Sequence, residues 1–167
     1  ACDKNYIPLD NRNIAYKAAE LLIRSYDIKK GVSIKSNKSI PVSAGLAGGS
    51  TDAAAVLKGM NELFKLNLTE VELMALGLRL GADVPFCIKG GTCLCTGIGE
   101  NIEVLEPFKD QIVLLVKPPF GVSTREAYGG FELDKIKKHV ETKKLISAMN
   151  SLDLTLMNYH MRNLLEN

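Results

Sequence analysis

The chain has 167 residues, of which 46% are hydrophobic and 24% charged, and its formal charge at pH 7 is +2. These values indicate an ordered globular protein that is long enough to bury a core. The near-neutral charge argues against a nucleic-acid partner, and no apolar stretch approaches the roughly 20 residues that cross a bilayer. We therefore expect a cytoplasmic protein that binds neither nucleic acid nor membrane, and the sequence leaves its oligomeric state open.

The cysteines also bear on the class of protein. Cys93 and Cys95 form a Cys-x-Cys pair, which lacks the Cys-x2-Cys spacing of a structural zinc site. We expect this pair and Cys87 to be small core residues of a reducing compartment, and we expect no metal held by protein side chains alone.

The first part of the chain predicts a helix followed by a strand. Apolar residues recur at helical spacing over 13–26, with Asp10 or Asn11 available as the helix cap. The alternation of apolar and polar residues over 32–35 predicts a strand that leads into a glycine-rich loop.

Two helices are expected after that loop. Residues 53–64 are rich in Ala, Leu and Met, with the apolar side chains on one face. A further helix is expected over 70–80. Thr69 precedes it and Glu72 lies in its first turn, which is the spacing of a capping box. The glycine-rich loop is therefore predicted to open into a helix.

Strands dominate the prediction for the segment that follows. Apolar runs bounded by glycine and proline predict strands at 84–89, 92–96, 102–105 and 111–117, the first three as a β-meander. A helix is expected over 124–128 with Ser123 as its cap, and residues 153–167 are expected to be helical. Helices and strands together indicate an α+β fold.

The glycine-rich stretch over 41–55 is the most informative segment. Its small residues let backbone amides approach an anion, and the helix that follows directs its free N–H groups toward the same point. Ser50 and Thr51 add hydroxyls that suit a phosphate or a phosphate-bound Mg²⁺. No Lys follows Gly49, so this is not a Gly-x4-Gly-Lys loop. The alternative is a surface turn that happens to precede a helix.

Residues 41–51 resemble the central motif of the GHMP superfamily of small-molecule kinases, in which Pro-x3-Gly-Leu is followed by small residues. Motifs at 80–86 and 96–100 make the chain more similar to members that phosphorylate a cytidine-diphosphate-linked methylerythritol in non-mevalonate isoprenoid biosynthesis. The resemblance implies transfer of the γ-phosphoryl group of ATP, bound with Mg²⁺, to a hydroxyl. Members acting on homoserine, mevalonate, phosphomevalonate or galactose remain alternatives, as does a non-catalytic nucleotide-binding module.

The resemblance also implies roles for single residues. The resemblance places Asn13 and Lys38 near the adenine. It assigns the binding of the triphosphate to Gly45, Leu46, Ala47, Gly48, Gly49, Ser50 and Thr51. Asp83 matches the aspartate that orients or deprotonates the acceptor hydroxyl, and Tyr128 matches an aromatic residue that stacks on cytosine. The residues alone leave simpler alternatives: a turn cap for Asp83, a helix start for Asn13, a solvated turn for Lys38 and core packing for Tyr128.

The fold implied is that of GHMP kinases, also described as ribosomal protein S5 domain 2-like. We expect residues 1–109 to form part of the N-terminal ATP-binding domain and 110–167 an incomplete C-terminal domain, with the glycine-rich loop and Asp83 facing one cleft. The family opens with a Lys-x-Asn-Leu segment and closes with a Gly-Ser-Gly-Pro-type motif, and neither has a counterpart at the corresponding end of this sequence. Because positioning and charge stabilisation drive phosphoryl transfer, we expect this chain alone to be inactive or impaired.

Overall fold

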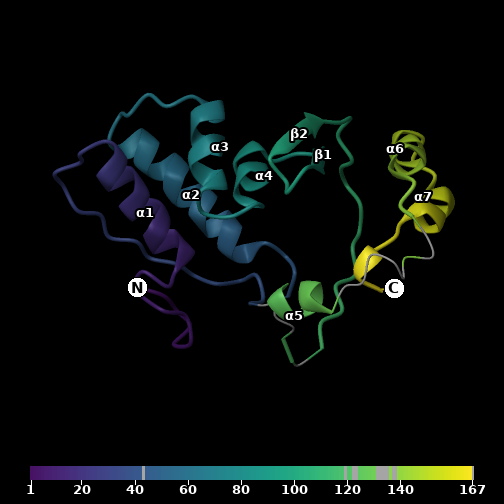
Figure 1. The fold of residues 1–167 in the computed structure, drawn as a ribbon, viewed down its shortest axis with the longest axis horizontal. Coiled ribbons are helices and arrows are strands. Elements are labelled where there is room, and N and C mark those ends of the chain that lie inside the picture. The colour runs from purple at the N-terminus through teal and green to yellow at the C-terminus, as the bar shows by residue number, and fades with distance from the viewer. Residues whose placement is uncertain (43, 119, 122–123, 131–135, 137–138, 167) are drawn as a thin grey trace. The chain divides into compact units, whose positions relative to one another are not determined.

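The computed structural model describes every residue of the chain except 43, 119, 122–123, 131–135, 137–138 and 167. The chain divides into two compact parts, Ala1–Leu105, here called unit 1, and Glu106–Asn167, here called unit 2 (Figure 1). Each unit is described by itself. Their assignment to an N-terminal and a C-terminal GHMP domain stays a prediction.

Helices form most of unit 1. They are α1 (Ile14–Ser25), α2 (Gly48–Leu63), α3 (Glu70–Leu78) and α4 (Val84–Lys89). In Figure 1, α1 and α2 lie side by side, and α3 and α4 pack on the same group. Their facing sides bury a common core, made of Ala18, Ala19, Leu22, Ala53, Ala54, Leu57, Met60, Leu73, Val84 and Ile88. This core fixes where the helix ends lie.

Asn13, rather than Asp10 or Asn11, caps α1. Its side chain accepts a hydrogen bond from the amide of Ala15 at 2.9 Å, and its backbone is extended, as a helix cap requires. The Asp10 carboxylate is already used by the Arg12 side chain, with Nη2 and Oδ2 2.8 Å apart. The predicted helix is confirmed, and the predicted cap is wrong.

Residues 32–35 do not form the predicted strand. The segment runs alongside the N-terminal residues, where the amide of Ser36 donates to the carbonyl of Ala1 at 2.9 Å, but the pairing amounts to one isolated bridge between Cys2 and Ser36. A strand needs a partner along its length, and no described segment supplies one here.

The segment over 84–89 is helix α4, so the predicted strand is wrong. Pro85 lies in the first turn of this helix, a position that proline favours because its missing N–H is not needed there. Val84 and Ile88 are four residues apart and both fully buried, which is helical spacing. The apolar run was too short to separate strand from helix by periodicity.

A two-stranded antiparallel hairpin follows α4. Strand β1 (Cys93–Thr96) pairs with β2 (Asn101–Val104), with Cys93 opposite Val104 and Thr96 opposite Asn101. The second and third predicted strands of the meander are thereby confirmed. The predicted capping box of α3 is also confirmed, since Thr69 accepts from the amide of Glu72 and the Glu72 carboxylate accepts from the amide of Thr69.

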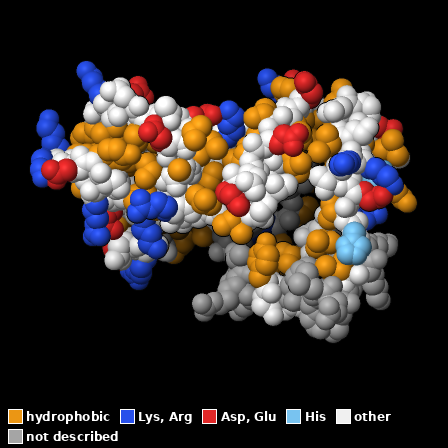
Figure 2. Space-filling view, turned by 45° about the horizontal axis from the view of Figure 1, so that its top comes forward, with side chains coloured by type: hydrophobic (Ala, Val, Ile, Leu, Met, Phe, Trp, Pro, Cys, Tyr) orange, Lys and Arg blue, Asp and Glu red, His pale blue; other side chains and the backbone are white. Residues whose placement is uncertain are grey.

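The regular elements among the described residues of unit 2 are helices, and residues 106–118 are irregular. The helices are α5 (Thr124–Gly129), α6 (Thr142–Asn150), α7 (Leu154–His160) and a short 3-10 helix, η2 (Leu164–Glu166). Residues 111–117 were predicted as a strand, but no described segment pairs with them and they are not one. The predicted cap Ser123 lies outside the described residues. Figure 2 shows exposed hydrophobic side chains, coloured orange, on the surface.

Candidate active site

Residues 44–47 of the glycine-rich stretch form a loop before α2, as predicted, and the stretch continues into the first turns of this helix. The helix begins at Gly48, five residues before the predicted start at Ala53, so Gly48, Gly49, Ser50 and Thr51 form its first turn. Ala47 is the N-cap and has a left-handed backbone (φ 50°), and its methyl side chain cannot cap the helix. No described residue accepts a hydrogen bond from the amides of Gly48, Gly49 and Ser50. Three N–H groups are left for an anion.

Gly48, the first residue of α2, has little room for a side chain, whereas a side chain at Gly49 would make ordinary contact. A Cβ atom added to Gly48 would lie 2.9 Å from Cγ2 of Ile40, and one added to Gly49 would lie 3.4 Å from Cγ2 of Ile14. Gly45 favours glycine, because its φ of 67° is left-handed. The small residues of the motif therefore have a packing reason as well as the proposed phosphate role.

The side chain of Lys38 lies against this first turn. Its Nζ donates to Oδ2 of Asp52 at 2.6 Å and to the carbonyl oxygen of Gly48 at 3.2 Å, and only 7% of the side chain is exposed. The solvated-turn alternative for Lys38 is therefore wrong. Sequence reasoning missed Asp52 as its partner, because the only signal, an acidic residue near a helix start, is too common to single it out.

Thr51 connects the start of α2 to α4. Its Oγ1 donates to the carbonyl oxygen of Ala47 at 3.0 Å and lies 3.6 Å from Sγ of Cys87. The amide of Cys87 in turn donates to the carbonyl oxygen of Asp83 at 3.0 Å. The first turn of α2 and the first turn of α4 are thus neighbours within unit 1.

Asp83 occupies the N-cap position of α4 without using its side chain there. The residue is exposed, and its carboxylate makes no hydrogen bond or ion pair with any residue that the structure describes. The turn-cap alternative therefore holds for its backbone position but not for its carboxylate. Ile14 lies close both to the first turn of α2 and to the residues before Asp83, because Cβ atoms added to Gly49 and to Gly81 would each lie within 4 Å of it.

The hairpin turn over 97–100 packs on the residue before Asp83. A Cβ atom on Gly99 would lie 2.9 Å from the carbonyl oxygen of Ala82, and the Glu100 carboxylate accepts from the amide of Ile98 at 2.7 Å. The second and third sequence motifs are therefore in contact. Sequence reasoning identified both segments and did not identify Glu100 as the residue that holds the turn.

The remaining predicted site residues are Asn13 and Tyr128. Asn13 caps α1, and both ends of its side-chain amide are used, since Nδ2 donates to the carbonyl of Pro8 at 2.9 Å. The helix-start alternative is confirmed for Asn13. Tyr128 lies in α5 of unit 2 and is 65% exposed, so core packing does not account for it. Adenine contact by Asn13 and Lys38, and stacking by Tyr128, stay predictions.

The cysteines and possible metal ligands give a mixed result. Cys87 packs against the core and Cys93 is half-buried, but Cys95 is exposed, so its predicted core position is wrong. Among the described residues, no three His, Cys, Asp or Glu side chains gather as a metal site requires. Within the same part of the chain, no helix has the length and apolar character needed to cross a membrane.

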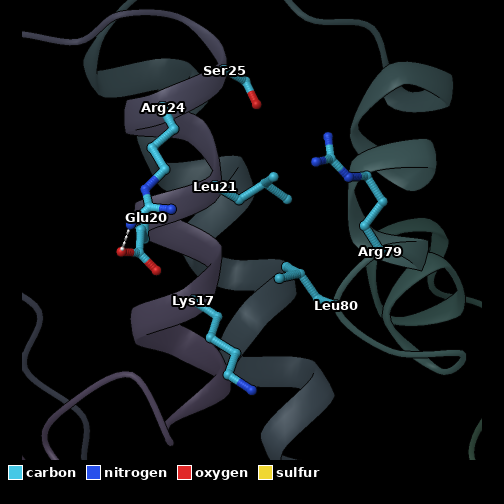
Figure 3. A pocket seen from close by; sticks show the side chains of 7 residues that line it. All are labelled: Lys17, Glu20, Leu21, Arg24, Ser25, Arg79 and Leu80. Carbon is cyan, nitrogen blue, oxygen red and sulfur yellow. Dashed lines mark hydrogen bonds and ion pairs between the residues drawn. The ribbon is translucent and has the colours of Figure 1, made fainter.

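A groove on the flank of α1 is separate from this site. Figure 3 shows it between α1 and the residues that follow α3, with Arg79 reaching toward α1 and Arg24 paired with Glu20 at 2.6 Å. It is lined by Lys17, Glu20, Leu21, Arg24, Ser25, Arg79 and Leu80. The groove contains no residue predicted for the site.

Comparisons with known proteins identify the family. Residues 13–91 match the model of the GHMP kinases N terminal domain. Proteins of Clostridium botulinum (strain Alaska E43 / Type E3) and Clostridium beijerinckii, both named 4-diphosphocytidyl-2-C-methyl-D-erythritol kinase, are each 58% identical over 99% of this chain. The chain spans 59% of the length of these relatives.

One solved structure is also similar to this chain. A crystal structure of a 4-(cytidine 5'-diphospho)-2C-methyl-D-erythritol kinase superimposes with a TM-score of 0.67 at 29% identity, over 90% of this chain and 53% of that one. The matched residues 13–91 include the start of α2 and Asp83. The chain therefore belongs to the GHMP kinase family.

Proposed function

We propose that this chain carries the ATP-phosphate site and the acceptor base of a kinase that phosphorylates a hydroxyl of 4-diphosphocytidyl-2-C-methyl-D-erythritol, in non-mevalonate isoprenoid biosynthesis. The observation that carries the proposal is the first turn of α2, whose Gly48, Gly49 and Ser50 amides have no acceptor among the described residues. These amides lie next to the helix that Asp83 begins. The names of the relatives support the acceptor.

The start of α2 suits a polyphosphate for two physical reasons. Its unpaired N–H groups point along the helix axis, and the helix dipole adds positive potential at the same end. Ser50 is half-buried beside them, and its hydroxyl has no hydrogen-bond partner among the described residues. Ser50 and Thr51 would therefore hold a phosphate-bound Mg²⁺, which would neutralise charge on the triphosphate.

Asp83 suits the role of the base because its carboxylate is exposed and uncommitted among the described residues. In the proposed step the acceptor oxygen bonds to the γ-phosphorus while the bond from that phosphorus to the bridging oxygen breaks. ADP leaves with the electron pair, and the hydroxyl proton passes to the Asp83 carboxylate. A cytoplasmic setting is part of the proposal, because ATP is the phosphoryl donor.

A titration tests the nucleotide site directly. Mg-ATP added to the ¹⁵N-labelled chain is expected to shift the amide signals of Gly48, Gly49 and Ser50, because phosphate oxygens would accept from those N–H groups. The exposed Gly59 of the same helix provides an internal control that should not move. Unchanged signals at millimolar ATP would remove the nucleotide site. Binding requires no catalysis, so this result does not depend on the rate of turnover.

Phosphorus NMR then tests the reaction. The chain is incubated with Mg-ATP and the cytidine-diphosphate methylerythritol, beside Asp83→Asn and a control, Asp27→Asn, at an exposed aspartate outside the site. Phosphorylated acceptor that Asp83→Asn reduces by about 10²-fold or more, and that Asp27→Asn retains, supports the base. Conversion of homoserine, mevalonate or galactose instead would reassign the acceptor. ATP binding without conversion of any acceptor would favour a nucleotide-binding module.

A further inference from the structure

Lys38 and Asp52 meet beside the first turn of α2, whose backbone amides form the proposed phosphate site. Lys38 comes from the segment before the glycine-rich stretch, and Asp52 is the fifth residue of α2. The Lys38 ammonium contacts both Oδ2 of Asp52 and the carbonyl oxygen of Gly48, at 2.6 and 3.2 Å. It therefore bridges the first residue of the helix and the second turn.

The buried position of Lys38 gives this contact its force. The side chain is 7% exposed, and that of Asp52 is 30% exposed. A charge removed from water to this extent is costly unless it is paired and hydrogen-bonded, so each group requires the other. The ion pairs of Lys29 with Asp27 and of Lys144 with Glu141 have both side chains largely exposed, and pairs of that kind contribute little.

The backbone of Lys38 is anchored as well as its side chain. Its amide donates to Oδ1 of Asp3 at 2.8 Å, and the amide of Asp3 donates to the carbonyl oxygen of Ser36 at 3.2 Å. A Cβ atom on Gly48 would lie 2.9 Å from Cγ2 of Ile40 and 3.6 Å from Nζ of Lys38. The first turn of α2 is thus in contact with the segment that precedes it.

Lys38 and Asp52 form the one ion pair at the start of α2 among the described residues, where the Thr51 hydroxyl also donates to the carbonyl oxygen of Ala47 and Ile40 packs on Gly48. Ala47 provides no cap, and the core residues of the helix begin only at Ala53. We propose that Lys38 and Asp52 form a clamp that holds the first turn of α2 in the geometry that receives nucleotide phosphates, so that both are positioning residues. This inference rests on the nucleotide site proposed above.

The clamp also has an electrostatic consequence. Without Lys38, the Asp52 carboxylate would stand unpaired one turn from the amides of Gly48, Gly49 and Ser50 and would repel a polyphosphate. The ammonium cancels that charge and leaves the positive helix end to act on the ligand. Two of the three ammonium N–H groups are used in this way.

Backbone order parameters of the chain without nucleotide test the clamp. In Lys38→Met, the order parameters of the Gly48, Gly49 and Ser50 amides are expected to fall from the rigid range, about 0.85, to below about 0.6. The control Lys58→Met removes an exposed lysine from the same helix and should leave these values unchanged. Lys38→Arg, which keeps the charge and its donors, is expected to restore them. A merely stabilising role would lower the midpoint of unfolding without this local loss of order.

Nucleotide titration of the same variants separates the clamp from the nucleotide site. Lys38→Met is expected to weaken Mg-ATP binding by about tenfold or more, and Lys38→Arg by less. Unchanged order parameters in folded Lys38→Met would overturn the clamp, even if the wild-type chain binds ATP. A wild-type chain that fails to bind ATP would overturn the nucleotide site, while a loss of order in Lys38→Met would still support the clamp. If Lys38→Met does not fold, Asp52→Asn replaces it, because this change keeps the shape of the side chain and one acceptor oxygen. Its order parameters and ATP binding are then interpreted in the same way.

Discussion

The two units differ in what they do with their apolar residues. In unit 1, Leu57 and Ile88 are fully buried where the helices meet. In unit 2, Leu114 and Val116 are 87% and 84% exposed, and Ala148 is the one buried hydrophobic residue among those that the structure describes. Apolar surface left in water does not contribute to folding, whereas the packed core of unit 1 does.

This difference indicates where the candidate site obtains its rigidity. The first turns of α2 and α4 are the ends of helices whose other faces form the core of unit 1. Their positions are therefore fixed by packing. The helices of unit 2 depend more on local signals, such as the Asp153 side chain that accepts from the amide of Leu156 at the start of α7.

The largest expected effect is that of a cavity in the core of unit 1. Leu57→Ala should lower the free energy of unfolding by about 2–5 kcal/mol, because the buried side chain loses its contacts and leaves a void. Leu114→Ala, the matched change in unit 2, should change it by less than about 0.5 kcal/mol. Urea unfolding followed at the amides of unit 1 measures both. Equal effects would contradict the comparison.

A smaller effect is expected where a glycine allows two helices to approach. A Cβ atom on Gly77 of α3 would lie 2.8 Å from Cγ1 of Val84 and 2.9 Å from Cδ1 of Ile88. Gly77→Ala should therefore cost about 1–3 kcal/mol by overpacking, although alanine favours the helix. Gly129→Ala in α5, where no atom lies within 4 Å, is the control. A shift of the unfolding midpoint to higher urea in Gly77→Ala would show that α4 yields without cost.

The confirmed sequence predictions are those that rest on local chemistry. The α3 capping box depends on two side chains three positions apart, and the α1 helix depends on apolar spacing within one segment. The GHMP resemblance likewise depends on contiguous motifs, of which the glycine-rich one ends in the first turn of a helix.

The failed strand predictions depended on partners distant in the chain. Residues 32–35 and 111–117 have strand-like composition, but a strand forms only where another segment pairs with it. For 84–89, the burial of Val84 and Ile88 against the other helices decided the structure. The pair of Lys38 with Asp52 was missed for the same reason, since no local pattern marks two residues that meet only in the fold.

Helix caps should distinguish the two units by about 1 kcal/mol. Thr69→Ala removes the cap of α3, which packs into the core, and should lower the stability of unit 1 by about 1 kcal/mol. Asp153→Ala removes the cap of α7, in which no residue is buried. It should lower the helix signal of unit 2 and leave the unfolding of unit 1 unchanged. A loss of unit 1 stability in Asp153→Ala would show that the units are coupled.

The smallest expected effect is a dependence on pH and salt. The amide and hydroxyl of Thr69 lower the pKa of Glu72 from its ordinary 4.5, and the Lys144 ammonium lowers the pKa of Glu141. Because the folded pKa is the lower one, each carboxylate stabilises the fold above its ordinary pKa, and this contribution is lost as the pH falls through the folded value.

Salt then separates the two causes. At about 1 M salt, where the Debye length is about 3 Å, the exposed ion pair of Glu141 with Lys144 is screened and the Glu141 pKa should rise toward its ordinary value. The Glu72 pKa should stay low, because it depends on a hydrogen bond from the Thr69 amide at 2.8 Å, and the amide carries no net charge to screen. Carboxyl ¹³C titration at low and high salt measures both. A Glu72 pKa that rises with salt as much as that of Glu141 would mean that charge, and not the capping box, holds the first turn of α3.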